Sequence, residues 1–83
     1  MIIEAIITCY VLKTIMSNGS YPSNGDIACS RHLKLGTEVV IQGKRYKCTD
    51  HLSRQYDSRF DIWMSNYKEC LKFGKKKLKV KIW

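Results

Sequence analysis

Residues 77–82 alternate strictly between lysine and an apolar residue, reading Lys-Leu-Lys-Val-Lys-Ile. Successive side chains of a β-strand point to opposite faces, so this pattern predicts a strand and excludes a helix. We expect Leu78, Val80 and Ile82 in a core and the three lysines in water. The lysine row fits an edge strand guarded against aggregation, and it equally fits a surface that binds phosphates.

Other segments carry the β-branched and aromatic residues that strands favour. Residues 2–12 are predicted to form a buried strand, and Ser17–Asp26 a loop with three turn pairs. The segments Glu38–Ile41 and Arg45–Thr49 are expected to form a hairpin, joined by the turn at residues 42–44.

A short helix is expected over Asn66–Lys72. Ser65 is suited to cap its start, and Gly74 lies just past its end. Its inner face is predicted to consist of Tyr67, Cys70 and Leu71.

The length of 83 residues indicates one domain, residues 1–83. The formal charge of +8, from 15 basic and 7 acidic residues, favours an anionic partner such as nucleic acid, a cell-wall polymer or an acidic protein face. The four cysteines contain no C-x-x-C pair, and His32 and His51 do not fall at ligand spacing. No metal site is therefore expected.

The apolar segment Met1–Met16 does not read as a secretion signal, because Glu4 interrupts it and no basic residue precedes it. It is also too short to span a membrane. Synthesis in the cytoplasm is therefore expected. Cys29 and Cys48 lie in strand-like segments that can come within disulfide reach, but a reducing cytoplasm favours two buried free thiols.

Two aspartates, Asp50 and Asp61, lie at or beside strand-like runs and are separated by the polar loop His51–Ser58. Carboxylates at strand ends converge on one cleft when a loop brings the strands together. Two solvated turn residues would show the same spacing, because Asp is common in turns. The spacing alone leaves both interpretations open.

Five segments follow one another in a recognisable order: Ile27-Ala28-Cys29, Leu35–Ile41, Tyr46–Asp50, Arg59–Trp63 and Phe73-Gly74-Lys75. This order resembles the small double-psi β-barrel domains of the rare lipoprotein A and three-aspartate type. Those domains are related to the barrel of membrane-bound lytic transglycosylase A and, more distantly, to expansins. The resemblance covers residues 27–83, and Thr8 with Tyr10 matches the family's opening strand. It implies a mainly β fold, a six-stranded double-psi barrel with one short helix.

The resemblance also implies a peptidoglycan-cleaving enzyme of the lytic transglycosylase kind that needs no cofactor. Asp50 falls on the family's acid position, and Asp61 on its partner carboxylate, which would raise the pKa of Asp50. The acid would protonate the glycosidic oxygen. As a carboxylate it would then accept a hydroxyl proton while the sugar closes an internal ether. Substrate contacts are expected from Tyr10, Tyr21, His51, Arg54 and Arg59, with Ser17 and Asn18 as further loop contacts.

Two other classes of function stay open, because a fold does not decide function. One is a non-catalytic module that binds the cell wall. The other is a phage-type binding protein, either a virion component or an inhibitor of a host factor. The expected partner is peptidoglycan or another anionic polymer, with a host protein or nucleic acid as alternatives. Phage proteins leave the cell through a holin or inside a virion, so cytoplasmic synthesis agrees with a wall substrate.

Overall fold

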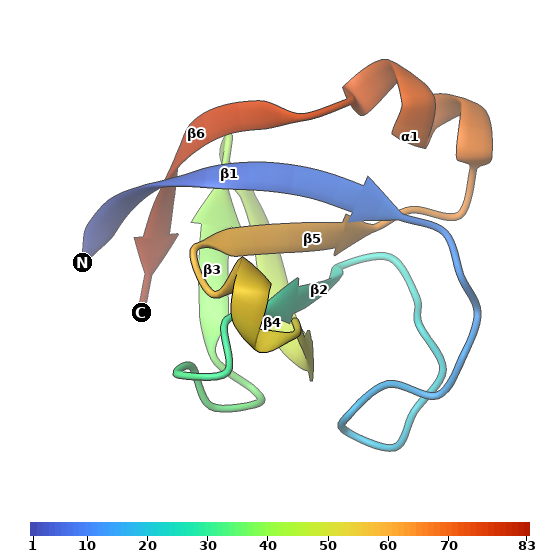
Figure 1. The fold of residues 1–83 in the computed structure, drawn as a ribbon, viewed down its shortest axis with the longest axis horizontal. Helices are drawn as coiled ribbons and strands as arrows, with labels where there is room; N and C mark the ends of the chain where they lie inside the picture. Colours follow the sequence, from blue (N-terminus) through green and yellow to red (C-terminus); the bar gives the residue numbers. More distant parts are fainter.

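Six strands and one short helix make up the fold of residues 1–83 in the computed structural model (Figure 1). The strands are β1 (Ile2–Tyr10), β2 (Asp26–Cys29), β3 (Glu38–Ile41), β4 (Lys44–His51), β5 (Arg59–Trp63) and β6 (Lys76–Ile82). A 3-10 turn, η1 (Arg54–Tyr56), precedes β5, and the helix α1 (Tyr67–Phe73) precedes β6.

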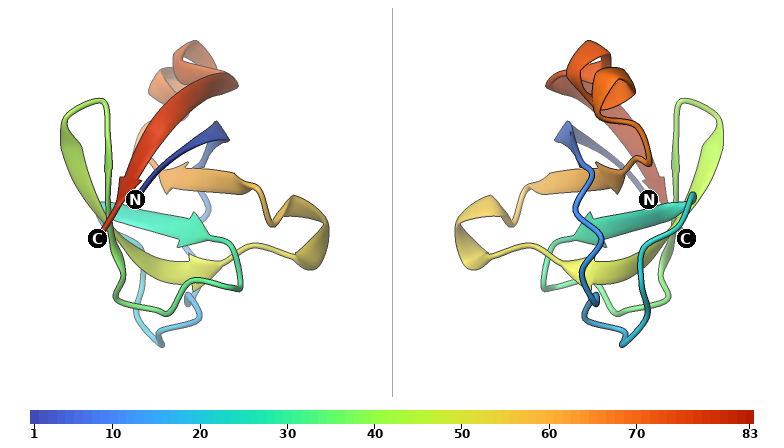
Figure 2. Two further views of the ribbon diagram at one scale, coloured as in Figure 1. Left: turned by 90° about the vertical axis from the view of Figure 1, so that its left-hand side faces the viewer. Right: turned by 90° about the vertical axis from the view of Figure 1, so that its right-hand side faces the viewer.

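The strands close into a barrel in the order β1-β5-β2-β4-β3-β6, so the predicted mainly β, six-stranded barrel is confirmed. The pairs β1–β5 and β2–β4 are parallel, and all the others are antiparallel. The two chain ends lie side by side (Figure 2), where the backbone N–H of Ile82 donates to the carbonyl of Met1 at 2.8 Å. No helix in the structure has the length and apolarity needed to cross a membrane.

The core is formed by the residues of each strand that point into the barrel. Ile7, Ile27, Val39 and Val80 come from four different strands and are completely buried. Burying a side chain of this size contributes about 1.5–3 kcal/mol. Because side chains alternate along a strand, the neighbours of these residues face outward, and this decides which polar residues share the outer surface.

The register predicted for residues 77–82 is confirmed. Val80 and Ile82 are buried, Leu78 is half-buried, and the three lysines are exposed. However, β6 pairs with β1 on one side and with β3 on the other. The strand is not an edge, so the lysines have no edge to guard and that explanation of the row is wrong.

The β3–β4 hairpin turns on two residues, Gln42 and Gly43, with φ angles of 51° and 78°. Positive φ at both central residues is typical of the tight turns that match strand twist. Lys44 already belongs to β4 and pairs with Ile41, so the turn is one residue shorter than predicted.

Helix α1 differs from its prediction at its start and on its faces. Asn66, rather than Ser65, caps it, with the Asn66 side chain accepting a hydrogen bond from the backbone N–H of Glu69 at 3.1 Å. Tyr67 and Leu71 were expected to point inward but are 64% and 63% exposed. A seven-residue helix has little surface to bury, and a covalent bond holds this one in place.

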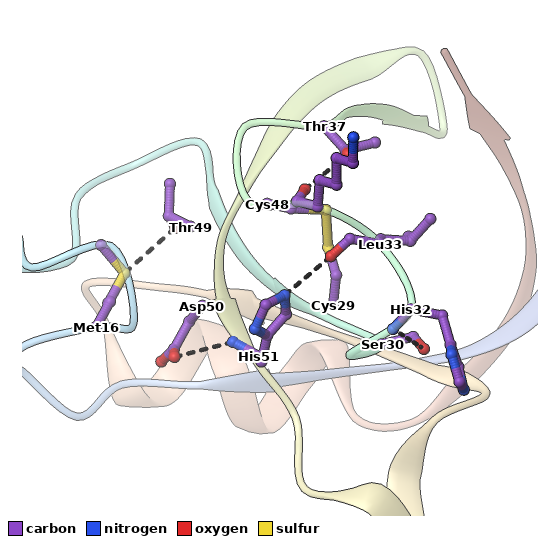
Figure 3. The surroundings of a disulfide bond; sticks show 11 residues. Met16, Cys29, Ser30, His32, Leu33, Thr37, Cys48, Thr49, Asp50 and His51 are labelled. Carbon is purple, nitrogen blue, oxygen red and sulfur yellow. Dashed lines mark hydrogen bonds between the residues drawn. A yellow bond between two sulfur atoms is a disulfide. The ribbon is translucent and has the colours of Figure 1, made fainter.

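Two disulfides cross-link the chain, which contradicts the expectation of free thiols. Cys29 of β2 bonds Cys48 of β4 inside the barrel (Figure 3), and Cys9 of β1 bonds Cys70 of α1. The parallel register pairs Ile27 with Cys48 and so brings the two buried sulfurs together. Disulfides of this kind are typical of proteins from oxidising compartments, so an argument from a reducing cytoplasm does not hold for these cysteines.

Candidate functional site

A row of outward-facing residues crosses four neighbouring strands. Thr8 pairs with Asp61, Asp61 pairs with Ala28, and Ala28 pairs with Asp50. Both aspartates therefore lie on one face, separated by the small side chain of Ala28. Adjacent strands are about 4.8 Å apart, so the two Cα atoms are about 10 Å apart. We call Thr8, Tyr10, Asp50 and Asp61 the carboxylate face.

Asp61 is a partly buried carboxyl. Its Oδ1 accepts a hydrogen bond from the Thr8 hydroxyl at 2.9 Å. Burial raises the pKa of Asp61, while the Thr8 hydrogen bond and the charge of Arg59 lower it and only partly offset the burial. A carboxyl with a raised pKa retains its proton to higher pH, as a general acid must.

Asp50 serves as a hydrogen-bond acceptor. Its Oδ1 accepts from the Ser17 backbone N–H at 3.0 Å, from the Ser17 hydroxyl at 2.6 Å and from the His51 backbone N–H at 2.9 Å. The nearby backbone N–H of Asn18 donates to the Thr49 carbonyl at 3.1 Å. Asp50 therefore anchors the long loop between β1 and β2 on the end of β4. No hydrogen bond joins Asp50 to Asp61.

Tyr10 is the residue on which the acidic groups converge. The pKa of its phenol is raised to about 12, first by burial and then by the charges of Asp50, Asp61 and Asp26. Its hydroxyl is buried and has no hydrogen-bond partner. A buried hydroxyl without a partner is uncommon. This phenol is a proton donor aimed at a place where a bound molecule can supply the missing acceptor.

Two hollows adjoin the far end of β5. One, of about 490 Å³, includes Tyr21 and Pro22, and the other, of about 710 Å³, includes Tyr46. Both are lined by Asn24, Trp63 and Ser65, so they form one continuous groove. Aromatic rings interspersed with amide and hydroxyl groups suit a ligand with both apolar faces and hydroxyls.

The groove and the carboxylate face are adjacent but separate. Trp63 follows Asp61 by two residues and faces the same way, about 7 Å further along the strand. Its indole N–H donates to the Leu12 carbonyl at 3.0 Å, which fixes the ring at the base of the long loop. Neither Asp50 nor Asp61 lines any of the three hollows in the structure. The shared face is thus present, and the groove begins one step beyond Asp61.

The predicted contact residues are divided among different places. Tyr10 lies on the carboxylate face, and Tyr21 lines the groove. His51 points away, because its Nε2 lies 2.9 Å from the Leu33 carbonyl and holds the loop after β2 (Figure 3). Arg59 lies over the Tyr56 ring at 4.8 Å and acts electrostatically on Asp61. Arg54 lines a third hollow, which neither aspartate reaches.

Ser17 and Asn18 are occupied within the long loop. Ser17 binds Asp50, and the Asn18 side chain accepts hydrogen bonds from Ser20. The important residues that the sequence analysis missed are Thr8, as a partner of Asp61, and Trp63. The alternation along β5 would have identified Trp63, because residues 59, 61 and 63 face the same way.

The structure contains no group of three or more His, Cys, Asp or Glu side chains that could hold a metal ion. Comparison of the chain with protein-family models, with curated proteins and with solved structures found no match.

Proposed function

We propose that the barrel binds the glycan strands of peptidoglycan and cleaves them as a lytic transglycosylase does. The observation that carries this proposal is the position of Asp61. It is partly buried, its pKa is raised, and it lies two residues from the aromatic groove at Trp63. The resemblance in residues 27–83 supports the same chemistry. Both predicted carboxylates are retained, with the acid role at Asp61 and a positioning role at Asp50.

In the proposed reaction Asp61 gives its proton to the glycosidic oxygen as the bond from that oxygen to the anomeric carbon breaks. The Asp61 carboxylate then accepts the proton of a hydroxyl on the same sugar, whose oxygen bonds to the anomeric carbon. The products are a free hydroxyl on one fragment and an internal ether on the other. No water is consumed, and Asp61 ends protonated, as it began.

The remaining residues orient the glycan. The Tyr10 hydroxyl donates a hydrogen bond to a sugar oxygen, because it has a proton and no partner in the protein. Asp50 holds the loop that carries Tyr21 and Asn24 to the wall of the groove. The two disulfides suit a protein that works outside a reducing cytoplasm, where the wall lies.

The experiment is solubilisation of purified sacculi, with mass spectrometry of the released fragments. Wild type should release fragments with an internal ether, each one water lighter than a hydrolysis product. Asp61→Asn should lower the rate by at least about 100-fold, the usual contribution of a general acid. Asp50→Asn should have a smaller effect. Glu4→Gln, which removes an exposed acid on the opposite side, serves as the matched control.

A second function is favoured by one observation: the aromatic groove contains neither aspartate. A groove of this composition supports binding without cleavage. In that case sacculi would pull the protein down and release no fragments, and Trp63→Ala would weaken the pull-down. Absence of both release and pull-down would contradict both functions.

A further inference from the structure

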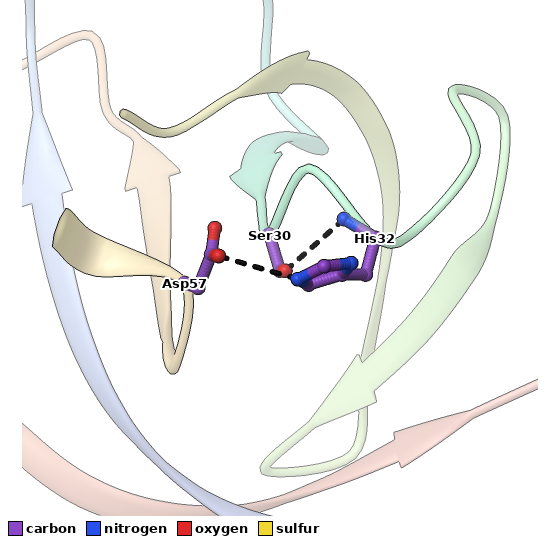
Figure 4. A network of polar contacts seen from close by, with 3 residues as sticks. All are labelled: Ser30, His32 and Asp57. Atoms are coloured by element: carbon purple, nitrogen blue, oxygen red, sulfur yellow. Dashed lines mark hydrogen bonds and ion pairs between the residues drawn. The ribbon is translucent and has the colours of Figure 1, made fainter. Parts of the chain in front are cut away.

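The third hollow, of about 410 Å³, is lined only by charged or ionisable side chains: Arg31, His32, Arg54 and Asp57. Arg31 and His32 come from the loop after β2, while Arg54 and Asp57 come from the η1 segment (Figure 4). Segments more than twenty residues apart in the sequence thus converge on one place. The Ser30 hydroxyl accepts a hydrogen bond from the His32 backbone N–H at 3.2 Å and shapes this loop.

The charges in the hollow are not balanced within the protein. His32 Nε2 lies 3.3 Å from one oxygen of Asp57, whose other oxygen is buried without a hydrogen-bond partner. Neither Arg31 nor Arg54 forms an ion pair with any carboxylate. Two guanidinium groups against one carboxylate leave one excess positive charge while His32 is neutral. An unpaired guanidinium presents a planar pair of donors that matches a carboxylate.

The hollow lies at the opposite end of β5 from the aromatic groove. Ala28 pairs with Asp61 in the antiparallel β2–β5 register, so the same register brings Ser30 level with Arg59, the first residue of β5. Figure 1 shows η1 beside the start of β5 and the long loop beyond its end. Asp61 therefore lies between the two, about 7 Å from either end of the strand. A chain bound along β5 would meet the groove, the acid and the charged hollow in turn.

We infer that Arg31 and Arg54 bind a carboxylate of the peptide that is attached to the glycan. This inference rests on the proposed function, and it adds that the substrate is glycan bearing an acidic peptide. A single excess positive charge matches the single charge of a carboxylate better than the double charge of a phosphate monoester. His32 and Asp57 set the shape of the hollow and keep the guanidinium groups apart.

The test uses the peptide without its sugar, so that it does not depend on cleavage. Binding of a synthetic acidic stem peptide is measured by calorimetry, beside the same peptide with its carboxyl groups amidated. The wild type should bind the free acid at least about tenfold more tightly, since hydrogen bonds between charged groups are worth about one such factor or more. Arg31→Gln and Arg54→Gln should each lose about tenfold, whereas Arg45→Gln, on another face, should change nothing.

The outcomes separate this inference from the proposed function. Equal binding of the acid and the amide overturns the charged hollow, whether or not sacculi are cleaved. Tighter binding of inorganic phosphate than of the peptide also overturns it. Arginine-dependent binding of the peptide together with intact sacculi supports the hollow and removes the cleavage. Circular dichroism of each variant ensures that a loss of binding is not a loss of fold.

Discussion

The two sides of the barrel share one core and differ in how their charges are treated. On one side Lys77, Lys79 and Lys81 point into water from β6, and Lys81 pairs across the sheet with Val40, which in turn pairs with Arg45. We call these four cations the lysine face. The contact between Lys77 and Glu4, at 3.5 Å, is its only ion pair, and both side chains are largely exposed. Such pairs contribute about 0–1 kcal/mol.

The carboxylate face shows the opposite treatment. Asp50 and Asp61 are partly covered, each bound by a hydroxyl, and burial raises the pKa of Asp61. Charges left in water cost little and favour solubility. A carboxyl withdrawn from water costs stability, and such carboxyls cluster at functional sites. The difference locates function on the carboxylate side, although the lysines dominate the net charge.

The covalent links follow the same division. One disulfide joins β2 to β4 and the other joins β1 to α1, while β3 and β6, which carry most of the lysine face, have none. The carboxylate side carries the long loop, the bulge between Ile27 and Ala28 and the partly buried acid. We conclude that the disulfides stabilise the side on which the packing is least regular.

The largest expected effect comes from removing these links. Replacing Cys29 and Cys48 by Ala should lower the free energy of unfolding by about 3 kcal/mol, and replacing Cys9 and Cys70 by about 4 kcal/mol, because longer loops gain more from closure. Denaturant unfolding measures both. Hydrogen exchange should accelerate in β2 and β4 of the first variant before it does in β6. Uniform acceleration across the barrel would contradict the division between the two sides.

A smaller effect of opposite sign is expected at Asp61. Its raised pKa means that the folded state holds the proton more tightly than the unfolded state. Stability of the wild type therefore falls as pH rises from the ordinary value of 3.8 through the raised one. Asp61→Asn removes this loss and should stabilise the protein at pH 7 by about 0.5–1 kcal/mol. The gain should shrink below pH 3.8, and thermal unfolding at both pH values measures it.

The smallest effect is expected on the lysine face. Replacing Lys79 and Lys81 by Gln should change the free energy of unfolding by less than about 0.5 kcal/mol, because both side chains are exposed and unpaired. Adsorption to anionic sacculi should weaken a few-fold at low salt, and the difference should vanish at high salt. Strong destabilisation would mean that the lysine face has a structural role.

The fold was largely predictable, because strand patterns are local. The alternation at residues 77–82 and the turn at Gln42-Gly43 require only neighbouring residues. The site was less predictable. Whether Asp50 or Asp61 retains a proton depends on Ser17 and Thr8, which lie 33 and 53 residues away in the sequence.

Two corrections have the same origin in distance or ambiguity. The pairing of Cys9 with Cys70 spans 61 residues and depends on where α1 settles, which no local pattern indicates. Ser65 and Asn66 are equally good capping residues, so preference alone could not choose between them. The exposed Tyr67 and Leu71 follow from that shift, since the helix begins one residue later than predicted.

The central claim is that Asp61 acts as the acid in its protonated form, and the pH dependence of sacculus solubilisation tests it most directly. The rate of the wild type should fall as pH rises through the raised pKa of Asp61. Thr8→Val removes the hydrogen bond that lowers this pKa, so the fall should move to higher pH. A wild-type rate that is flat or increases with pH, or a fall at the same pH in both proteins, would contradict the claim.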